Sequence, residues 1–156
     1  MERIAGQFAV VGNPIQHSLS PRIHAAFAGQ TGRAIDYRTQ QVDLEAFESW
    51  VADFFEPEGR GLNVTLPFKL RAYELAEVTS ERAALAGAAN FLMRDQEGRL
   101  FADNTDGKGL VTDMVDNAGW SIHGARILIL GAGGAVKGVI PALLSEQPST
   151  IHVVNR

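Results

Sequence analysis

The feature that most constrains the fold is a short glycine-rich segment between two apolar stretches near the end of the sequence. Residues 126–130 (RILIL) are mostly apolar, residues 131–135 (GAGGA) include three glycines, and an apolar stretch then continues to Leu144. A second apolar run follows at residues 151–154. A strand, a tight turn, a helix and a second strand make up a βαβ unit, whose two strands run parallel. The sequence therefore predicts that a doubly wound α/β sheet begins at Arg126.

The glycine-rich segment is also typical of one kind of binding site. A turn without side chains lets backbone N–H groups and the positive end of the following helix approach a pyrophosphate. A strand before the turn and a helix after it are the context that such a site requires. Val136 takes the third position of this fingerprint, where glycine or alanine is usual, and a tight turn without a ligand is the alternative. The residues predicted to bind a dinucleotide are Gly131, Ala132, Gly133, Gly134 and Ala135.

The end of the second predicted strand indicates which dinucleotide is bound. An acidic residue there accepts a hydrogen bond from the ribose of NAD, whereas a basic residue can bind the additional phosphate of NADP. No acid follows Val154, and the next two residues are Asn155 and Arg156. A guanidinium group can bind a phosphate through two parallel hydrogen bonds. Asn155 and Arg156 therefore favour NADP as the cofactor, and a solvated Arg156 without a ligand is the alternative.

The preceding part of the chain alternates between predicted strands and helices. Capping residues and prolines predict helices that begin at Ser20, Asp43, Pro67 and Thr79. On the first of these helices Ile23, Ala26 and Phe27 form an apolar stripe. Residues 57–61 are expected to end the second helix. The strands are predicted at residues 8–11, 35–42, 62–65, 90–93 and 100–102.

The order of these elements predicts an α/β fold in two parts. Residues 95–98 resemble the turn of a β-hairpin inside an otherwise alternating pattern, so the sheet is expected to be mixed. A polar break at residues 103–107 is the predicted hinge. We expect residues 1–103 to form an N-terminal mixed, mostly parallel α/β sandwich domain that binds the substrate. Residues 104–156 are expected to form the start of an incomplete, Rossmann-type NADP-binding domain, of which the first βαβ unit is present.

Polar residues gather near the predicted strand ends. In open α/β sheets, ligands bind at the edge formed by the carboxyl ends of the strands, and four polar groups are expected there or in the loops that follow. Taken singly, each residue also fits a helix cap, a turn or a solvated surface, and His17 and His24 are interpreted as structural. The four groups are Ser18 with Ser20; Asn63 with Thr65 and Lys69; Asn90; and Asn104 with Thr105 and Asp106.

These residue types point to a particular ligand chemistry. Hydroxyl and amide side chains at several loops suit a small ligand with many hydroxyl groups and a carboxylate. Lys69 and Asp106 form the one credible acid–base pair among them. The sequence therefore predicts a small-molecule site in which Lys69 and Asp106 are catalytic.

Composition excludes several other classes of function. The 156 residues carry a formal net charge of -4, which leaves no broad cationic surface for nucleic acid. Cysteine is absent and the four histidines are scattered, so no metal site is expected. The apolar run of residues 8–11 ends at Gly12, too early for a signal peptide or a membrane span. A cytoplasmic protein without a membrane or nucleic-acid partner is expected.

Six motifs, taken in order along the whole chain, resemble one known family. They are NPIQHSLSP (13–21), NVTLPFK (63–69), GAAN (87–90), NTDG (104–107), GAGGA (131–135) and NR (155–156). Together they resemble the shikimate dehydrogenases. Two positions differ from the pattern of that family, since Phe91 stands where threonine is common and Val136-Lys137 where a small residue and arginine are common.

The resemblance implies a function and a role for each motif residue. It implies NADP-dependent, reversible reduction of 3-dehydroshikimate to shikimate in the biosynthesis of chorismate and the aromatic amino acids, by a monomer or homodimer. Lys69 and Asp106 would be catalytic, and Gly131 to Ala135 with Asn155 and Arg156 would bind NADP. Ser18 and Ser20 would bind the substrate carboxylate. The ring hydroxyls would be bound by Asn63, Thr65, Asn90 and Asp106, and Lys69 would also bind the substrate.

Two alternatives remain open. The first is a relative that also acts on quinate, with NAD as cofactor, because the same loops could accept both ring acids. The second belongs to another class: a shikimate-binding module without catalysis, which applies if the protein ends at Arg156. A family member continues well beyond that residue, so the 156-residue form itself is expected to bind the cofactor poorly.

Overall fold

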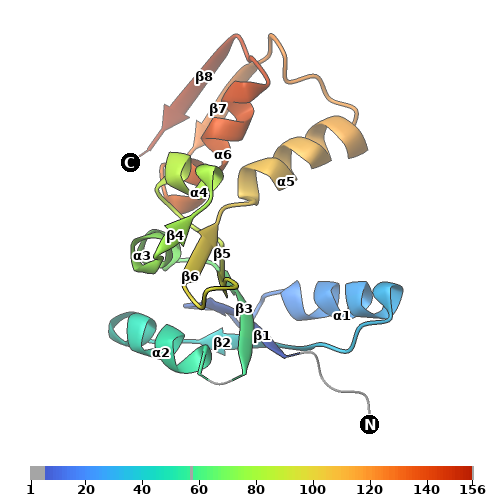
Figure 1. Ribbon diagram of the computed structural model, residues 1–156. Helices are drawn as coiled ribbons and strands as arrows, with labels where there is room; N and C mark the ends of the chain where they lie inside the picture. Colours follow the sequence, from blue (N-terminus) through green and yellow to red (C-terminus); the bar gives the residue numbers. More distant parts are fainter. Residues whose placement is uncertain (1–5, 57, 156) are drawn as a thin grey trace.

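A computed structural model describes residues 6–56 and 58–155 of the chain (Figure 1). A six-stranded sheet has the strand order β2-β1-β3-β5-β6-β4, and a separate two-stranded sheet pairs β7 with β8. The strands are β1 (Gln7–Gly12), β2 (Asp36–Gln41), β3 (Gly59–Val64), β4 (Val78–Thr79), β5 (Phe91–Arg94), β6 (Leu100–Asp103), β7 (Arg126–Leu130) and β8 (Thr150–Val154). The helices are α1 (Ser20–Thr31), α2 (Phe47–Phe54), α3 (Lys69–Leu75), α4 (Glu81–Ala86), α5 (Asp106–Thr112) and α6 (Gly134–Ser145).

The larger sheet is mixed, as the sequence predicts. Strand β1 runs parallel to β2 and β3, and β4 runs parallel to β6. Strand β5 is antiparallel to both β3 and β6, because residues 95–98 close a hairpin in which Asp95 Oδ1 accepts hydrogen bonds from the backbone N–H groups of Glu97 and Arg99. Two antiparallel steps leave β3 and β6 pointing the same way, so their carboxyl ends lie at one edge of the sheet.

The hydrophobic core lies on one face of this sheet. In Figure 1, α2 and α3 lie on one side of the strands and α1 lies on the other. Phe47 of α2 and Phe68 just before α3 are fully buried, and their rings stack with centroids 4.4 Å apart. Helix α1 contains no buried residue, and Ile23 and Phe27 of its predicted apolar stripe are about half exposed. The core is therefore one-sided within the described residues.

Two predicted element boundaries differ from the structure. Strand β3 begins at Gly59 within the predicted break, because a Cβ atom there would lie 2.1 Å from the carbonyl oxygen of Phe54 and only glycine fits. The third helix begins at Lys69, after a cis peptide bond between Leu66 and Pro67.

Three further differences concern helix caps. Thr79 belongs to β4, and Ser80 caps α4 instead, where its hydroxyl accepts a hydrogen bond from the N–H of Ala83 at 3.1 Å. Ser20 is the first residue of α1 and makes no capping bond, so it is not an N-cap. Asp43 precedes a short 3-10 turn, Leu44–Ala46, before α2, also without a side-chain cap.

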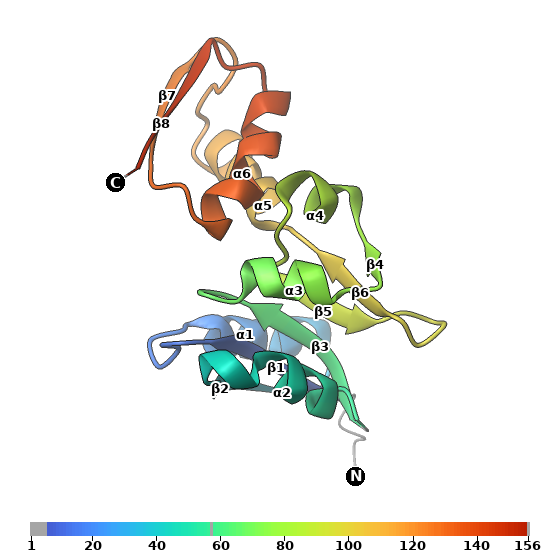
Figure 2. The ribbon, with the colours of Figure 1, turned by 90° about the vertical axis from the view of Figure 1, so that its left-hand side faces the viewer.

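The second sheet confirms the predicted βαβ unit. Strands β7 and β8 pair in parallel, with Arg126 opposite Thr150 and Leu130 opposite Val154, and α6 connects them. Figure 2 shows α6 between this sheet and helices α4 and α5. The predicted fold class, a mixed α/β sheet followed by a βαβ unit, is confirmed, while the division at residues 103 and 104 stays a prediction.

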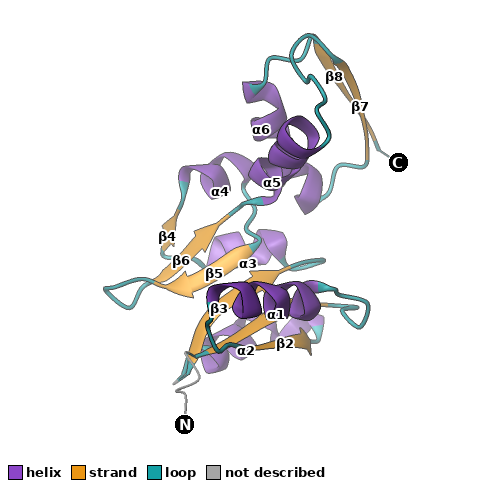
Figure 3. Cartoon of the chain, turned by 90° about the vertical axis from the view of Figure 1, so that its right-hand side faces the viewer, coloured by secondary structure: helices purple, strands orange, loops and turns teal. Residues whose placement is uncertain are grey.

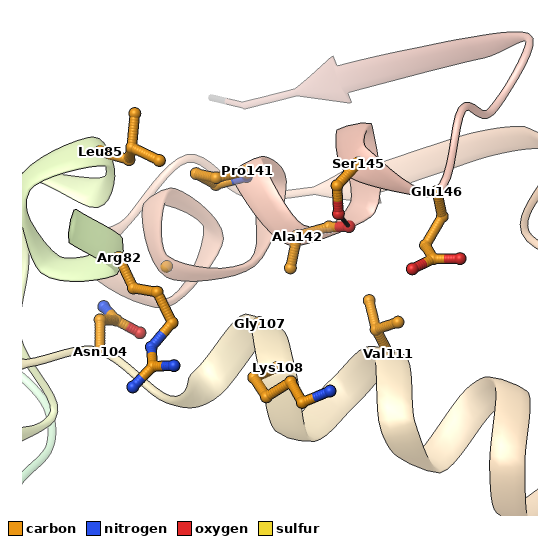
Figure 4. Close-up of a pocket in the computed structure, with 11 residues that line it drawn as sticks. Arg82, Leu85, Asn104, Gly107, Lys108, Val111, Pro141, Ala142, Ser145 and Glu146 are labelled. Atoms are coloured by element: carbon orange, nitrogen blue, oxygen red, sulfur yellow. Dashed lines mark hydrogen bonds between the residues drawn. The ribbon is translucent and has the colours of Figure 1, made fainter. Parts of the chain in front are cut away.

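Helices α5 and α6 join the two sheets through close backbone contact, which Figure 3 shows from another side. A Cβ atom at Gly107 would lie 2.6 Å from the carbonyl oxygen of Gly138, and one at Gly138 would lie 2.8 Å from the side chain of Asn104. A depression of about 310 Å³ remains between α4, α5 and α6, where Arg82 points toward Asn104 (Figure 4). None of the helices in residues 6–56 and 58–155 is long and apolar enough to span a membrane.

Candidate active site

The two predicted catalytic residues are in direct contact. Lys69 and Asp106 are 37 positions apart in the sequence, and the Nζ atom of Lys69 lies 2.5 Å from Oδ2 of Asp106. Each is the first residue of a helix that follows a strand, α3 after β3 and α5 after β6. The parallel course of β3 and β6 brings those helix starts to the same edge of the sheet. Lys69 is buried and Asp106 half-buried, so water screens this ion pair less than a surface pair.

Asn90 orients the carboxylate of this pair. Its Nδ2 atom donates a hydrogen bond to Oδ1 of Asp106 at 2.8 Å, and its Oδ1 atom accepts one from the N–H of Thr105 at 3.0 Å. The prediction that Asn90 lies at or after the carboxyl end of a strand is wrong, because it directly precedes β5. Since β5 is antiparallel to β3 and β6, its beginning lies at the edge where those two strands end.

The predicted substrate-binding residues line two adjoining depressions. The first has a volume of about 240 Å³ and opens over the pair of Lys69 and Asp106. The second, of about 350 Å³, contains Ser18 and shares Ser20, Thr65 and Val10 with the first. The predicted residues that line the first depression are Ser20, Asn63, Thr65, Lys69, Asn90 and Asp106. The structure thus brings all seven predicted residues to one region.

Two further aromatic residues belong to this region, although the sequence did not single them out as site residues. The hydroxyl of Tyr37 donates a hydrogen bond to Oδ1 of Asn63 at 2.7 Å. The ring of His24, which the sequence interpreted as structural, stacks on that of Tyr37 with centroids 4.1 Å apart and lines the first depression. His24 lies four residues after Ser20 on one helix face, which is a spacing that the sequence does contain.

Burial changes the acidity of both rings. Burial raises the pKa of Tyr37 to about 12, although the Ser20 hydroxyl acts in the opposite direction. Burial lowers the pKa of His24, and the side chain of Asn63 partly offsets this shift. Tyr37 is therefore protonated and His24 neutral near pH 7, so neither ring adds charge to the depression.

Asn104 holds the backbone next to the acid–base pair and is almost completely buried, with 2% of its surface exposed to solvent. Its Nδ2 atom donates to the carbonyl oxygen of Ala88, and its Oδ1 atom accepts from the N–H of Asp106 at 3.1 Å. Asp103 in turn accepts a hydrogen bond from the N–H of Asn104 at 2.7 Å and is paired with Arg82. Burial by itself would raise the pKa of Asp103, but the hydrogen bonds from Arg82, Ser80 and Asn104 hold it below its usual value.

The glycine-rich turn lies next to the acid–base pair. Gly131 has a φ of +111°, which favours glycine, and its N–H donates to the carbonyl oxygen of Val154 at 2.7 Å. A Cβ atom at Gly134 would lie 3.3 Å from Cβ of Lys69. Cβ atoms at Gly131 and Gly133 would meet nothing within 4 Å, so the space over the turn is open.

An open turn at the start of a twelve-residue helix fits the pyrophosphate of a dinucleotide. Of the two residues predicted to favour NADP, Asn155 directly follows β8, and Arg156 lies outside the described residues. Within residues 6–56 and 58–155, no group of three or more His, Asp or Glu side chains could hold a metal ion.

The fold and the site together define a class: α/β proteins in which a polar depression lies beside a βαβ unit of the dinucleotide-binding type. Within this class, the profile described as shikimate dehydrogenase substrate binding domain matches residues 10–92, just over half of the chain. The chain belongs to the shikimate dehydrogenase family.

Individual relatives match almost the whole chain. A shikimate dehydrogenase (NADP(+)) of Marinobacter nauticus is 58% identical over 149 residues, which cover 96% of this chain and 54% of that protein. The corresponding protein of Hahella chejuensis is 52% identical over 149 residues, which cover 96% of this chain and 55% of that protein. The chain thus spans about half the length of the curated relatives it matches.

Solved structures match the fold equally well. An Ael1 enzyme from Pseudomonas putida has a TM-score of 0.87 and 44% identity, with coverage of 97% of this chain and 55% of that one. A shikimate 5-dehydrogenase from Thermus thermophilus, in complex with NADP(H) and shikimate, has a TM-score of 0.85 and 35% identity. That match covers 96% of this chain and 56% of the other.

Proposed function

We propose that the protein to which this chain belongs is an NADP-dependent shikimate dehydrogenase. It would reduce 3-dehydroshikimate reversibly to shikimate in the biosynthesis of chorismate and the aromatic amino acids. The observation that carries the proposal is the contact of Lys69 with Asp106 at 2.5 Å, between a hydroxyl-lined depression and a glycine-rich turn. The names and bound ligands of the relatives support it.

The chain's own residues account for the proton that this reaction requires. NADPH held at the glycine-rich turn would supply the hydride for the carbonyl carbon of the substrate. As the C=O bond becomes an alcohol, the carbonyl oxygen takes a proton from the Nζ ammonium of Lys69. Asp106 accepts a hydrogen bond from Lys69 and so holds Nζ toward the oxygen. In the reverse direction Lys69 takes back the O–H proton, and NADP⁺ would accept the hydride that leaves the carbon.

The remaining predicted residues bind and orient the two ligands. Ser18 and Ser20, which line the second depression, donate hydrogen bonds to the substrate carboxylate. Asn63, Thr65 and Asn90, with Asp106, bind the ring hydroxyls. The turn from Gly131 to Ala135 takes the pyrophosphate, and Asn155 with Arg156 takes the additional phosphate of NADP. The 1–103 and 104–156 parts would then be the substrate-binding and cofactor-binding regions.

Replacement of the proton donor tests this function. In the full-length protein, Lys69→Ala should reduce kcat for shikimate oxidation about 10²- to 10⁴-fold, because general acid–base catalysis contributes that much. The KM for shikimate should change much less, since the neighbouring hydroxyl and amide groups still bind the ring. The measurement is steady-state kinetics with NADP. A rise in KM as large as the fall in kcat, or an unchanged kcat, would contradict a catalytic role for Lys69.

The choice of cofactor and substrate is a separate question. One related structure, from Listeria monocytogenes, is in complex with shikimate and NAD, which favours a test of both cofactors. Turnover of shikimate and quinate with NADP and NAD, in all four combinations, decides between the proposal and a quinate-active, NAD-using relative. The cytoplasmic location and the monomer or homodimer expected from the sequence stay predictions.

A further inference from the structure

Tyr37 reaches the candidate site from a strand that does not border it. Strand β2, which carries Tyr37, is separated from β3, which carries Asn63, by β1. Tyr37 is paired with Phe8, and Asn63 is paired with Val10 two residues further along β1. Because alternate residues of a strand face the same side, all four lie on one face of the sheet. The Tyr37 side chain crosses over β1, and its hydroxyl lies 2.7 Å from Oδ1 of Asn63.

The position of the Tyr37 ring is fixed by a second ring. His24 of α1 stacks on it with an interplanar angle of 11° and a centroid distance of 4.1 Å. Helix α1 contains no buried residue, and the stacking of His24 on Tyr37 is a specific tertiary contact of this helix. The phenolic oxygen also lies near Ser20 of the same helix, which lowers its pKa in part. The hydroxyl is therefore held between α1 and Asn63.

The hydrogen bond from Tyr37 determines which half of the Asn63 amide faces the ligand. An asparagine side chain has an oxygen that accepts and an NH₂ group that donates. The Tyr37 hydroxyl, which keeps its proton at neutral pH, donates to Oδ1, and that contact holds the amide in one orientation. The side chain of Asn63 also interacts with the His24 ring. The Nδ2 group of Asn63 is then the half that remains for a ligand in the depression that Asn63 lines.

We propose that Tyr37 is a positioning residue, which locks Asn63 so that its NH₂ group donates to a hydroxyl oxygen of the bound ring acid. This role rests on the proposed function for the identity of that ligand. Without the hydroxyl of Tyr37, the Asn63 amide can rotate and present its oxygen. Binding of the ring acid then weakens, while proton transfer at Lys69 and Asp106 is unaffected.

A double-mutant cycle in the full-length protein tests this proposal. Tyr37→Phe keeps the ring and its stack on His24, and should raise the KM for shikimate about 5- to 20-fold, with kcat changed less than about 2-fold. Asn63→Ala should raise KM at least as much. The double variant should be no worse than Asn63→Ala alone, because Tyr37 acts only through Asn63. Additive effects, or an unchanged KM in Tyr37→Phe, would overturn the role.

The second tyrosine of the chain provides a matched control. Tyr73 of α3 packs against the hydrophobic core, so Tyr73→Phe removes the same hydroxyl away from the depression and should leave KM unchanged. Melting temperatures of both Phe variants should stay within about 2 °C of the parent, which separates positioning from unfolding. A KM increase of equal size in Tyr73→Phe would also overturn the proposal.

A readout without turnover separates this proposal from the proposed function. The side-chain NH₂ of Asn63 should be rigid in ¹⁵N NMR relaxation of the parent protein and mobile in Tyr37→Phe. If the parent neither binds nor oxidises shikimate, the proposed function fails, and the NMR comparison still decides the role of Tyr37. Equal rigidity of the Asn63 amide in both proteins would overturn that role.

Discussion

Asp103 is a buried carboxylate one residue before the segment that holds the candidate catalytic aspartate. It accepts hydrogen bonds from Ser80, from Arg82 and from the N–H of Asn104. Asn104 in turn fixes the N–H of Asp106. Asp103 therefore acts on the site only by holding the backbone, and its contribution belongs to stability.

The lowered pKa of Asp103 links this contribution to pH. A carboxyl group whose pKa is lower in the folded state stabilises the fold above its unfolded pKa of about 3.9, and this stabilisation is lost as the pH falls through the folded pKa. Asp103→Asn should lower the free energy of unfolding by about 1–3 kcal/mol at pH 7, because it leaves buried donors poorly paired. It should also flatten the acid limb of the stability curve below about pH 4.

Urea titrations between pH 2 and pH 7 measure both effects. Asp53→Asn on the exposed surface of α2 is the matched control, which should change stability by less than about 0.5 kcal/mol. A variant Asp103→Asn with the same pH dependence as the parent protein would show that the pKa of Asp103 is not lowered.

The sequence predicts which single residues lie close together only where those residues follow strands that end at the same edge of the sheet. Lys69 and Asp106 could be predicted to meet, because residues that follow parallel strands reach the same edge. Tyr37 could not, because its contact with Asn63 depends on the strand order and on which face of β2 it occupies. A sequence does not show that β1 lies between β2 and β3.

At the scale of elements, the packing of α5 on α6 depends on two glycines. A Cβ atom at Gly107 would lie 2.6 Å from the carbonyl oxygen of Gly138 and 2.8 Å from Cβ of Ala142. Two residues further along the same helix, a Cβ atom at Gly109 would meet nothing within 4 Å. The same substitution at these two positions therefore has opposite consequences.

Gly107→Ala should lower the free energy of unfolding by about 1–3 kcal/mol, because an added methyl group pushes the two helices apart. Gly109→Ala should raise it by about 0.5–1 kcal/mol, since alanine favours the helix and nothing obstructs its side chain. Chemical denaturation of the three proteins checks both signs. A stabilised Gly107→Ala would mean that the contact between α5 and α6 is looser than the structure has it.

The elements themselves were largely predictable, and their boundaries less so. The strands and the hairpin follow from apolar runs and turn residues, which act locally. The start of β3 at Gly59 was missed because glycine is typical of a break, whereas here it allows the close approach of Phe54. The local sequence pattern does not predict a strand boundary that depends on a tertiary contact.

At the scale of the whole chain, the described residues expose an apolar surface on the side of the second sheet that faces away from α6 (Figure 1). Leu128 and Leu130 of β7 are 63% and 77% exposed, and Val154 of β8 is 56% exposed. Parallel strands are normally covered on both faces, and an uncovered apolar sheet associates readily with a second copy. A polypeptide limited to these 156 residues should therefore self-associate through this surface.

Sedimentation velocity of that polypeptide at about 50 µM should show species larger than the 16.8 kDa monomer, because exposed apolar sheets associate at micromolar concentrations. The double variant Leu128→Lys/Leu130→Lys should shift the distribution toward monomer, since two charges on the open face repel a second copy. Leu85→Lys on α4, where the leucine is 67% exposed, adds a charge away from this surface and should leave the distribution unchanged. A monomeric parent polypeptide, or equal dissociation by both charge variants, would show that the exposed face of β7 and β8 does not drive association.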